Sequence, residues 1–141
     1  MMATLCPFCD PEPIRVIKRG DDYISLLSNP RLVAGHALVV PKLHVKQLHD
    51  VSYSIRFDMF VEAMRLARLI VTRGLGTGYE IRIKYEPNLD DGPVHVSHLH
   101  IHVVPRNEGD GLFGATETGR ELDAFRALPA LERDEMKMAL A

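Results

Sequence analysis

The sequence lacks any run approaching the roughly 20 consecutive apolar residues that a membrane-spanning helix requires. Its first residues, MMATLCPFCD, contain no basic segment followed by an apolar one, so no secretory signal is visible and a cytoplasmic location is expected. A strong charge imbalance is also absent, because the formal net charge is −2. This argues against broad electrostatic binding to nucleic acid. We therefore expect no membrane and no nucleic-acid partner.

Cysteine is scarce, and the only two cysteines are Cys6 and Cys9 in the stretch CPFC. A Cys-x-x-Cys pair is typical of a redox dithiol, of half a metal site, or of two unrelated thiols. In thioredoxin-like proteins the pair opens a helix, but here Pro11 and Pro13 follow closely and disfavour one. The metal interpretation needs two further ligands, usually histidines, from elsewhere in the chain.

The composition is that of an ordinary globular protein. Apolar residues make up 46% and charged residues 26% of the 141 residues, which suits a hydrophobic core and argues against disorder. There is no internal repeat, low-complexity tract or linker. Length and continuity together predict one domain over residues 1–141.

Alternation of apolar and polar residues predicts strands, and a spacing of three to four predicts a helix. A long helix is expected over residues 54–73, capped by Ser52 or Ser54 and closed by Gly74, Gly76 and Gly78. Pro41 and Pro105 are expected to end the third and fifth strands. The five predicted strands cover residues 14–18, 23–27, 36–40, 79–85 and 96–104.

Residues 95–106 read HVSHLHIHVVPR, with a histidine at every second position from His98 to His102. On a strand, side chains at i, i+2 and i+4 share one face, so His98, His100 and His102 would form a row with the apolar residues between them facing the core. Three interpretations follow. The row is a solvated polar face, a set of metal ligands, or a catalytic site in which a neutral imidazole acts as nucleophile.

HLHIHVV resembles the signature His-φ-His-φ-His-φ-φ (φ apolar) of the histidine-triad superfamily of nucleotide hydrolases and transferases. Residues 35–45, GHALVVPKLHV, are similar to that family's Gly-His-φ-φ-Val-φ-Pro-Lys-x-His segment. Asn88 with its glycine-containing loop and the pair Pro105-Arg106 are also similar, and CPFC resembles the zinc-binding branch. The resemblance covers residues 6–106. It leaves outside a tail, residues 116–141, of helical propensity interrupted at Pro129.

The resemblance implies that His100 attacks the α-phosphate of a nucleotide and becomes a nucleotidyl-histidine, which water or another acceptor then resolves. Nδ1 of His100 is expected to donate to a backbone carbonyl, which leaves Nε2 free to attack. His102 is expected to donate to the phosphate or the leaving atom. His36 resembles a fourth active-site histidine that backs the triad, the alternative being a hydrogen-bonded structural histidine.

For the zinc-binding branch, the resemblance implies a structural Zn²⁺ held by Cys6, Cys9, His44 and His98. Four nitrogen and sulfur ligands make a closed tetrahedral site. Two buried free thiols are the alternative. His49 is expected at the surface.

The resemblance also implies a set of substrate-binding residues. Ser28 occupies the position at which relatives often carry a ribose-binding aspartate, and His95 a position where they often place a small polar residue. The phosphate loop offers Gly92, Pro93, Val94 and His95, and its backbone N–H groups, which Pro93 lacks, are expected to bind the phosphate. Leu26, Leu27 and Phe8 are either base-pocket or simple core residues. The full predicted substrate-binding set is Asn88, Gly92, Ser28, Asn29, His95 and Leu27.

The fold implied is α+β: a five-stranded antiparallel sheet with one long helix on one face, paired with a second copy into a ten-stranded sheet. The activity implied is cleavage at the α-phosphate of adenosine phosphoramidates or diadenosine polyphosphates. Two alternatives remain from other classes. One is a non-catalytic, zinc-stabilised nucleotide-binding or adaptor protein, and the other is a redox protein that uses CPFC.

Overall fold

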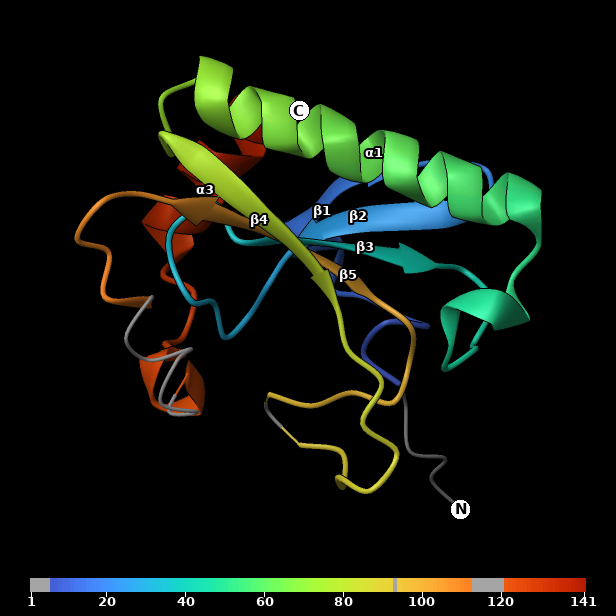
Figure 1. Ribbon diagram of the computed structural model, residues 1–141. Helices are drawn as coiled ribbons and strands as arrows, with labels where there is room; N and C mark the ends of the chain where they lie inside the picture. The colour runs from blue at the N-terminus through green and yellow to red at the C-terminus, as the bar shows by residue number, and fades with distance from the viewer. Residues whose placement is uncertain (1–5, 93, 113–120) are drawn as a thin grey trace.

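The computed structural model describes residues 6–92, 94–112 and 121–141. One five-stranded antiparallel sheet, in the order β1-β2-β3-β5-β4, carries the long helix α1 along one face (Figure 1). This confirms the predicted α+β class. The strands are β1 (Val16–Arg19), β2 (Tyr23–Leu27), β3 (Ala37–Pro41), β4 (Gly78–Ile83) and β5 (Ile101–Arg106).

Helix α1 (Tyr53–Thr72) begins where the sequence predicts. The Ser52 hydroxyl accepts a hydrogen bond from the Ile55 backbone N–H at 3.3 Å and so satisfies one of the first free amides of the helix. The helix ends at Arg73, and Gly74 adopts a positive φ of 73° just beyond it. The shorter helices are η1 (Pro13–Arg15), η2 (Leu48–Asp50), η3 (Glu121–Ala124) and α3 (Ala130–Leu140).

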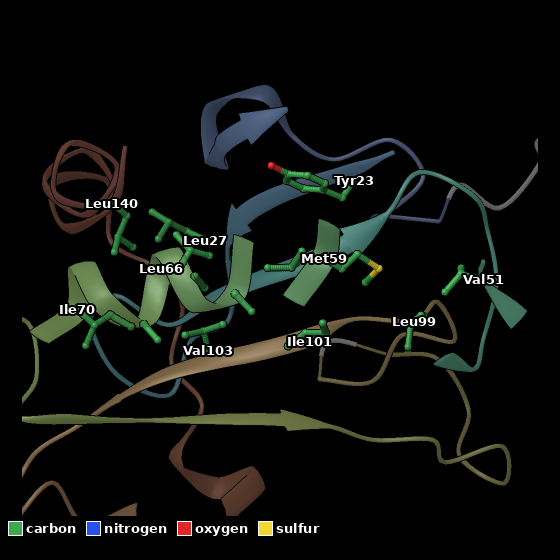
Figure 2. Close-up of a cluster of buried hydrophobic side chains, with 14 residues drawn as sticks. Tyr23, Leu27, Val51, Met59, Leu66, Ile70, Leu99, Ile101, Val103 and Leu140 are labelled. Carbon is green, nitrogen blue, oxygen red and sulfur yellow. The ribbon is translucent and has the colours of Figure 1, made fainter. Parts of the chain in front are cut away.

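Side chains alternate along each strand, so the two faces of the sheet pack against different parts of the protein. Leu27, Val39 and Ile101 point toward α1 and pack against its buried residues, as Figure 2 shows for Met59, Leu66 and Ile70 among others. Leu26 and Leu38, each one position before one of these residues, point away from the helix and pack with Phe8 from the amino-terminal segment. This second face of the sheet is therefore the one that α1 leaves uncovered.

The boundaries of four predicted strands need correction. The fourth, β4, starts one residue earlier and ends two residues earlier than predicted. Residues 14–15 form a 3₁₀ turn, so β1 starts at Val16. Pro41 is the last residue of β3, and Pro105 lies inside β5. Pro105 is tolerated because β3 pairs with β5 only as far as Val103, so the missing N–H faces no ladder on that side. Residues 96–100 precede β5 and do not pair in the sheet.

The tail is only partly as predicted. Residues 116–120 lie outside the described residues, and α3 begins after Pro129. Arg31 and Glu132 form a two-pronged ion pair with both distances at 2.9 Å, which fastens α3 to the loop before β3. Arg65 joins buried Glu62 to the Leu140 carbonyl. Within the described part of the chain, no helix is long and apolar enough to cross a bilayer.

Candidate active site and metal centre

Strand register places His102 within a row of side chains that crosses the sheet on the face away from α1. His102 in β5 pairs with Leu38 on one side and with Arg82 on the other. Directly paired residues share a face, so their side chains are neighbours. The row, from β2 to β4, consists of Leu26, Leu38, His102 and Arg82.

His100 lies just before β5, and a backbone carbonyl fixes its protonation. Its Nδ1 lies 2.7 Å from the His98 carbonyl oxygen, which can only accept a hydrogen bond. Nδ1 must therefore carry the proton, and Nε2 keeps its lone pair. The ring packs edge-on against Phe8, with centroids 5.0 Å apart. The expectation that Nδ1 of His100 donates to a backbone carbonyl is met.

The neighbouring His102 has the opposite tautomer, and the cause is again a backbone group. The Leu32 N–H donates to Nδ1 of buried His36 at 3.1 Å, so the His36 proton resides on Nε2. That Nε2 donates to Nδ1 of His102 at 2.9 Å. Neutral His102 consequently holds its own proton on Nε2. The chain of bonds thus sets a lone pair on His100 beside an N–H on His102, with ring centroids 4.8 Å apart.

Burial favours the neutral imidazoles of His100 and His102. Burial lowers the pKa of His102 well below its usual value, and the nearby His36, His100, Arg82 and Lys84 lower it further. Burial also lowers the pKa of His100, although its hydrogen bond to the His98 carbonyl acts in the opposite direction. Because a protonated imidazole has no lone pair to attack with, this environment favours the nucleophilic form.

Two cavities meet at His100 and His102. The first, called here the apolar cavity, is lined by Pro7, Phe8, Glu12, Arg15, Ser28, Asn29, Pro30, Leu38, Gly92, Val94, Val96, His100, His102 and Phe125. The second, called the basic cavity, is lined by Lys46, Arg82, Lys84, Tyr85, Glu86, Pro87, Val94, His95, Val96, Ser97, His98, His100, His102 and Phe125. The two histidines therefore stand between an apolar and a charged compartment.

Most of the predicted substrate-binding residues line one of these cavities. Ser28, Asn29 and Gly92 line the apolar cavity and His95 lines the basic one. The Ser28 hydroxyl donates to the Pro30 carbonyl at 2.7 Å. The Asn29 side-chain oxygen accepts from the Leu128 N–H at 2.9 Å.

Two residues of the predicted substrate-binding set, Leu27 and Asn88, line neither of these two cavities. Leu27 is fully buried in the core under α1, because its position in β2 turns it to the helix face. Asn88 is exposed in the loop after β4. Pro93 of the predicted phosphate loop lies outside the described residues. Phe8 lines the apolar cavity, whereas Leu26 belongs to the core beneath it.

Sequence reasoning missed Phe125. This residue lies in the tail yet lines both cavities, and its ring centroid is 6.2 Å from that of His36. The segment is held in place because Arg31 and Arg126 exchange backbone hydrogen bonds of 2.7 and 2.9 Å. No local pattern signals this contact, since it depends on where the tail folds back.

The predicted metal ligands converge beside the triad. Cys6, Cys9, His44 and His98 place one sulfur or nitrogen atom each, and these four atoms all lie within 4.8 Å of one another. His98 is buried, and its Nε2 donates to the Pro41 carbonyl at 2.8 Å, so Nδ1 presents a lone pair to the two thiols. Its distances to the sulfurs of Cys6 and Cys9 are 3.4 and 3.5 Å.

This donor set fits Zn²⁺. Zn–S bonds of about 2.3 Å and Zn–N bonds of about 2.1 Å give a tetrahedron whose sulfur–nitrogen edges are about 3.6 Å, close to the observed contacts. Burial raises the pKa of the Cys9 thiol, and the adjacent Cys6 raises it further. A dication at this point would reverse that effect and stabilise both thiolates. The site is closed by four protein ligands, which is typical of a structural metal.

A model of the HIT domain matches residues 12–109 of the chain. The chain belongs to this family. An uncharacterized HIT-like protein of Mycobacterium tuberculosis is 31% identical over 115 residues, covering 76% of this chain and 75% of the relative. A bis(5'-adenosyl)-triphosphatase of Dictyostelium discoideum is 28% identical over 109 residues, covering 74% and 71%.

Among solved structures, a zinc-bound histidine triad family protein from Mycobacterium smegmatis matches with a TM-score of 0.69 and 30% identity. The match covers 96% of this chain and 92% of that one. The present chain brings two cysteines and two histidines together, so it has a donor set suited to the same metal. Phe125 lies beyond the matched HIT domain, so this wall of the site comes from outside the family segment.

Proposed function

We propose that this protein is a nucleotide hydrolase or nucleotidyl transferase that cleaves at the α-phosphate through a nucleotidyl-His100 intermediate. One observation carries the proposal: two adjacent neutral imidazoles have opposite tautomers, fixed by backbone groups, at the junction of two cavities. A lone pair and a hydrogen-bond donor are thus available side by side for one phosphoryl group.

In the first step, Nε2 of His100 attacks the α-phosphorus. A P–N bond forms, the bond from phosphorus to the leaving atom breaks, and the leaving group departs with the bonding electron pair. The imidazole becomes a cation with phosphorus on Nε2 and a proton on Nδ1, and its hydrogen bond to the His98 carbonyl stabilises that charge. Nε2–H of His102 donates to a phosphoryl oxygen or to the leaving atom.

In the second step, water or another acceptor attacks phosphorus and breaks the P–N bond. The electron pair returns to Nε2 of His100, and the acceptor's proton passes to solvent. The departed leaving group takes up from solvent the proton that the water released, so the net reaction with water converts a nucleotide conjugate into a nucleoside monophosphate and the protonated leaving group. The apolar cavity, with Phe8, Leu38 and Val96, suits the nucleoside, and Ser28 and Asn29 lie beside it for the ribose.

The metal would be held by Cys6, Cys9, His44 and His98, and it would supply structure rather than chemistry because no coordination position is left open. It would join the amino-terminal segment to the chain just before His100. Phe8, which lies between the two cysteines, packs against both His98 and His100. The metal site would therefore hold the nucleophile's ring in position.

The substrates that we propose are adenosine phosphoramidates and diadenosine polyphosphates. The name of the Dictyostelium relative, a bis(5'-adenosyl)-triphosphatase, supports the second group. We also propose that the protein acts as a homodimer, since α1 and β4 expose apolar side chains on one side of the molecule.

The test is a comparison of wild type, His100→Ala and His49→Ala, the last being a matched change at an exposed histidine. Each protein is incubated with a panel of adenosine conjugates, and product is measured by chromatography and covalent adducts by intact mass. We expect wild type and His49→Ala to release AMP and to form an acid-labile adduct, and His100→Ala to lose activity by at least about 10³-fold. Equal turnover by His100→Ala would refute the mechanism.

A further inference from the structure

The row of side chains that contains His102 continues to the edge strand β1. His102 pairs with Leu38, Leu38 with Leu26, and Leu26 with Val16 of β1. Neighbouring strands lie about 4.8 Å apart, so the row leads away from His102 across the whole of β3 and β2. Arg15 comes directly before Val16 and lines the apolar cavity. It therefore lies at the opposite end of this cavity from His102.

The apolar cavity contains one pair of charged side chains, Glu12 and Arg15, besides the neutral histidines at its other end. Nε of Arg15 lies 3.1 Å from a carboxylate oxygen of Glu12. The Arg15 side chain is only 8% exposed, whereas that of Glu12 is 64% exposed. Burying a guanidinium is costly unless it is paired, so an apolar residue would form this wall at a lower cost. The pair makes a polar end wall in a cavity that is otherwise mostly apolar.

This end wall has hydrogen-bonding atoms that no described residue uses. Nη1 of Arg15 donates to the Leu27 carbonyl at 2.7 Å, and Nε donates to Oε1 of Glu12, so two bonds fix the guanidinium. Nη2 of Arg15 and Oε2 of Glu12 form no hydrogen bond with the part of the chain that the structure describes. A guanidinium nitrogen can only donate and a carboxylate oxygen can only accept. The wall therefore offers a donor and an acceptor next to each other.

A nucleotide bound as proposed above directs its base toward this wall. Its α-phosphate lies at His100 and His102, and the ribose separates the phosphate from the base. The base consequently lies farther along the apolar cavity, in the direction of Glu12 and Arg15. The edge of adenine carries an amino donor beside a ring nitrogen that accepts. That pattern is complementary to the donor and the acceptor of the wall.

We propose that Glu12 and Arg15 select the nucleobase through hydrogen bonds to its edge. The Glu12 carboxylate accepts from the amino group of adenine, and Nη2 of Arg15 donates to a neighbouring ring nitrogen. This inference rests on the proposed function, because it requires a nucleoside in the apolar cavity, and it deepens that function by naming the residues that distinguish one base from another. A purine without the amino group leaves the carboxylate unpaired on binding, and such a site discriminates against the analogue.

The test compares the binding of AMP with that of purine riboside 5′-monophosphate, which lacks only the amino group of the base. Affinities are measured by calorimetry on zinc-loaded wild type, Glu12→Ala and Asp10→Ala. Glu12 is largely exposed, so its truncation should leave the fold intact. Asp10 is the matched control, because it is an exposed carboxylate of the same segment that does not line the cavity. We expect wild type to bind AMP about tenfold more tightly, as a hydrogen bond to a charged group allows.

Glu12→Ala is expected to bring this ratio to within about twofold of unity, and to change the affinity for purine riboside monophosphate by less than about threefold. Asp10→Ala should keep the ratio of wild type. Arg15→Lys retains the charge but has a single nitrogen, so it cannot make all three contacts. It should weaken both nucleotides by about threefold or more, because the ring nitrogen that Nη2 contacts is present in both. Unchanged affinities in Arg15→Lys would exclude Arg15 from the site.

A ratio near unity in wild type, or one that persists in Glu12→Ala, would overturn the proposal. Failure of wild type to bind either nucleotide would overturn it together with the nucleoside site. Because the measurement is binding and not turnover, it is independent of the chemistry at His100. If the ratio behaves as expected but His100→Ala retains full turnover, base selection stands and the proposed mechanism fails. If His100 is required but the ratio is unity, the mechanism stands and base selection by Glu12 fails.

Discussion

At the scale of single residues, backbone atoms decide which nitrogen of His100 and of His102 carries the proton. An imidazole can place its proton on either nitrogen, and the two forms have opposite uses. The His98 carbonyl fixes one form in His100, and the Leu32 N–H fixes the other in His102 through His36. The identical side chains therefore differ in what they offer, a lone pair on His100 and an N–H on His102, because their hydrogen-bond neighbours differ.

The position of His36 leads to a testable prediction. His36→Ala removes the donor that fixes the His102 tautomer, so we expect kcat to fall about 10²-fold with KM changed by less than about threefold, in the range for loss of one oriented group. His36→Gln should recover part of kcat, because an amide offers one donor and one acceptor, as the neutral imidazole does. Steady-state kinetics on an adenosine conjugate measures both.

Unfolding in urea serves as the control for this pair of variants. His36 is buried, so both substitutions are expected to lower the free energy of unfolding by about 1–3 kcal/mol. If His36→Gln recovers stability but not kcat, then His36 is only a structural residue.

At the scale of elements, the metal centre joins three segments that are distant in sequence. Cys6 and Cys9 lie in an amino-terminal turn, His44 follows β3, and His98 precedes β5. The sheet and α1 have a core of their own, in which these ligands take no part. Loss of the metal should therefore release the amino-terminal segment without unfolding the sheet.

Zinc removal tests this division. A chelator, or His44→Ala, is expected to expose Phe8, to make both thiols reactive and to lower Tm by about 5–10 °C, which corresponds to roughly 2–3 kcal/mol for a chain of this size. Far-UV circular dichroism should change little. His49→Ala is the matched control, and it should retain metal and Tm. Thiols that react equally before and after chelation would contradict a metal centre and favour a redox or unrelated pair.

Much of this architecture was predictable because each element has a local signal. The helix α1 was bounded to within one residue by its spacing and its Ser52 cap, and β2 was predicted in full. The errors lie where the boundary of a strand depends on the neighbouring strand and not on the local pattern of residues. Residues 96–100 alternate like a strand but belong to no strand of the sheet, although the Leu99 N–H donates to the Val45 carbonyl at 2.6 Å. Pro105 is accepted in β5 because the pairing with β3 has already ended.

The triad and the metal ligands were recognisable because their spacing is itself the signal. The cationic side chains of the basic cavity were not recognised. Strict alternation in YEIRIKY puts Arg82 and Lys84 on one face, but which face meets His102 depends on the register between β4 and β5. Phe125 was missed for a similar reason, since its contact depends on the path of the tail.

At the scale of the whole molecule, α1 has two apolar stripes. One is buried against the sheet, and the other is exposed: Phe57, Val61, Met64 and Val71 have exposed fractions of 69%, 48%, 64% and 44%. Their spacing of four, three and seven residues puts them on one face. Tyr79 on the edge strand β4 is 52% exposed and lines the same hollow as Val61, Met64 and Val71. An apolar face that continues onto a strand edge is typical of an interface.

We expect a second copy of the chain to cover this face, with α1 and β4 of each subunit in contact. Sedimentation should then give twice the 15.8 kDa chain mass. Met64→Glu places a charge at the centre of the face, and we expect it to weaken dimerisation by about 10²-fold or more, because an unpaired charge in an apolar interface is costly. Leu131→Glu, at a residue of α3 that is 72% exposed, is the matched control and should remain dimeric.

Since the face lies across the sheet from His100, monomeric Met64→Glu should keep its metal and its fold. A wild-type protein that sediments as a monomer at high micromolar concentration would refute the pairing, and one that stays dimeric after Met64→Glu would place the interface elsewhere.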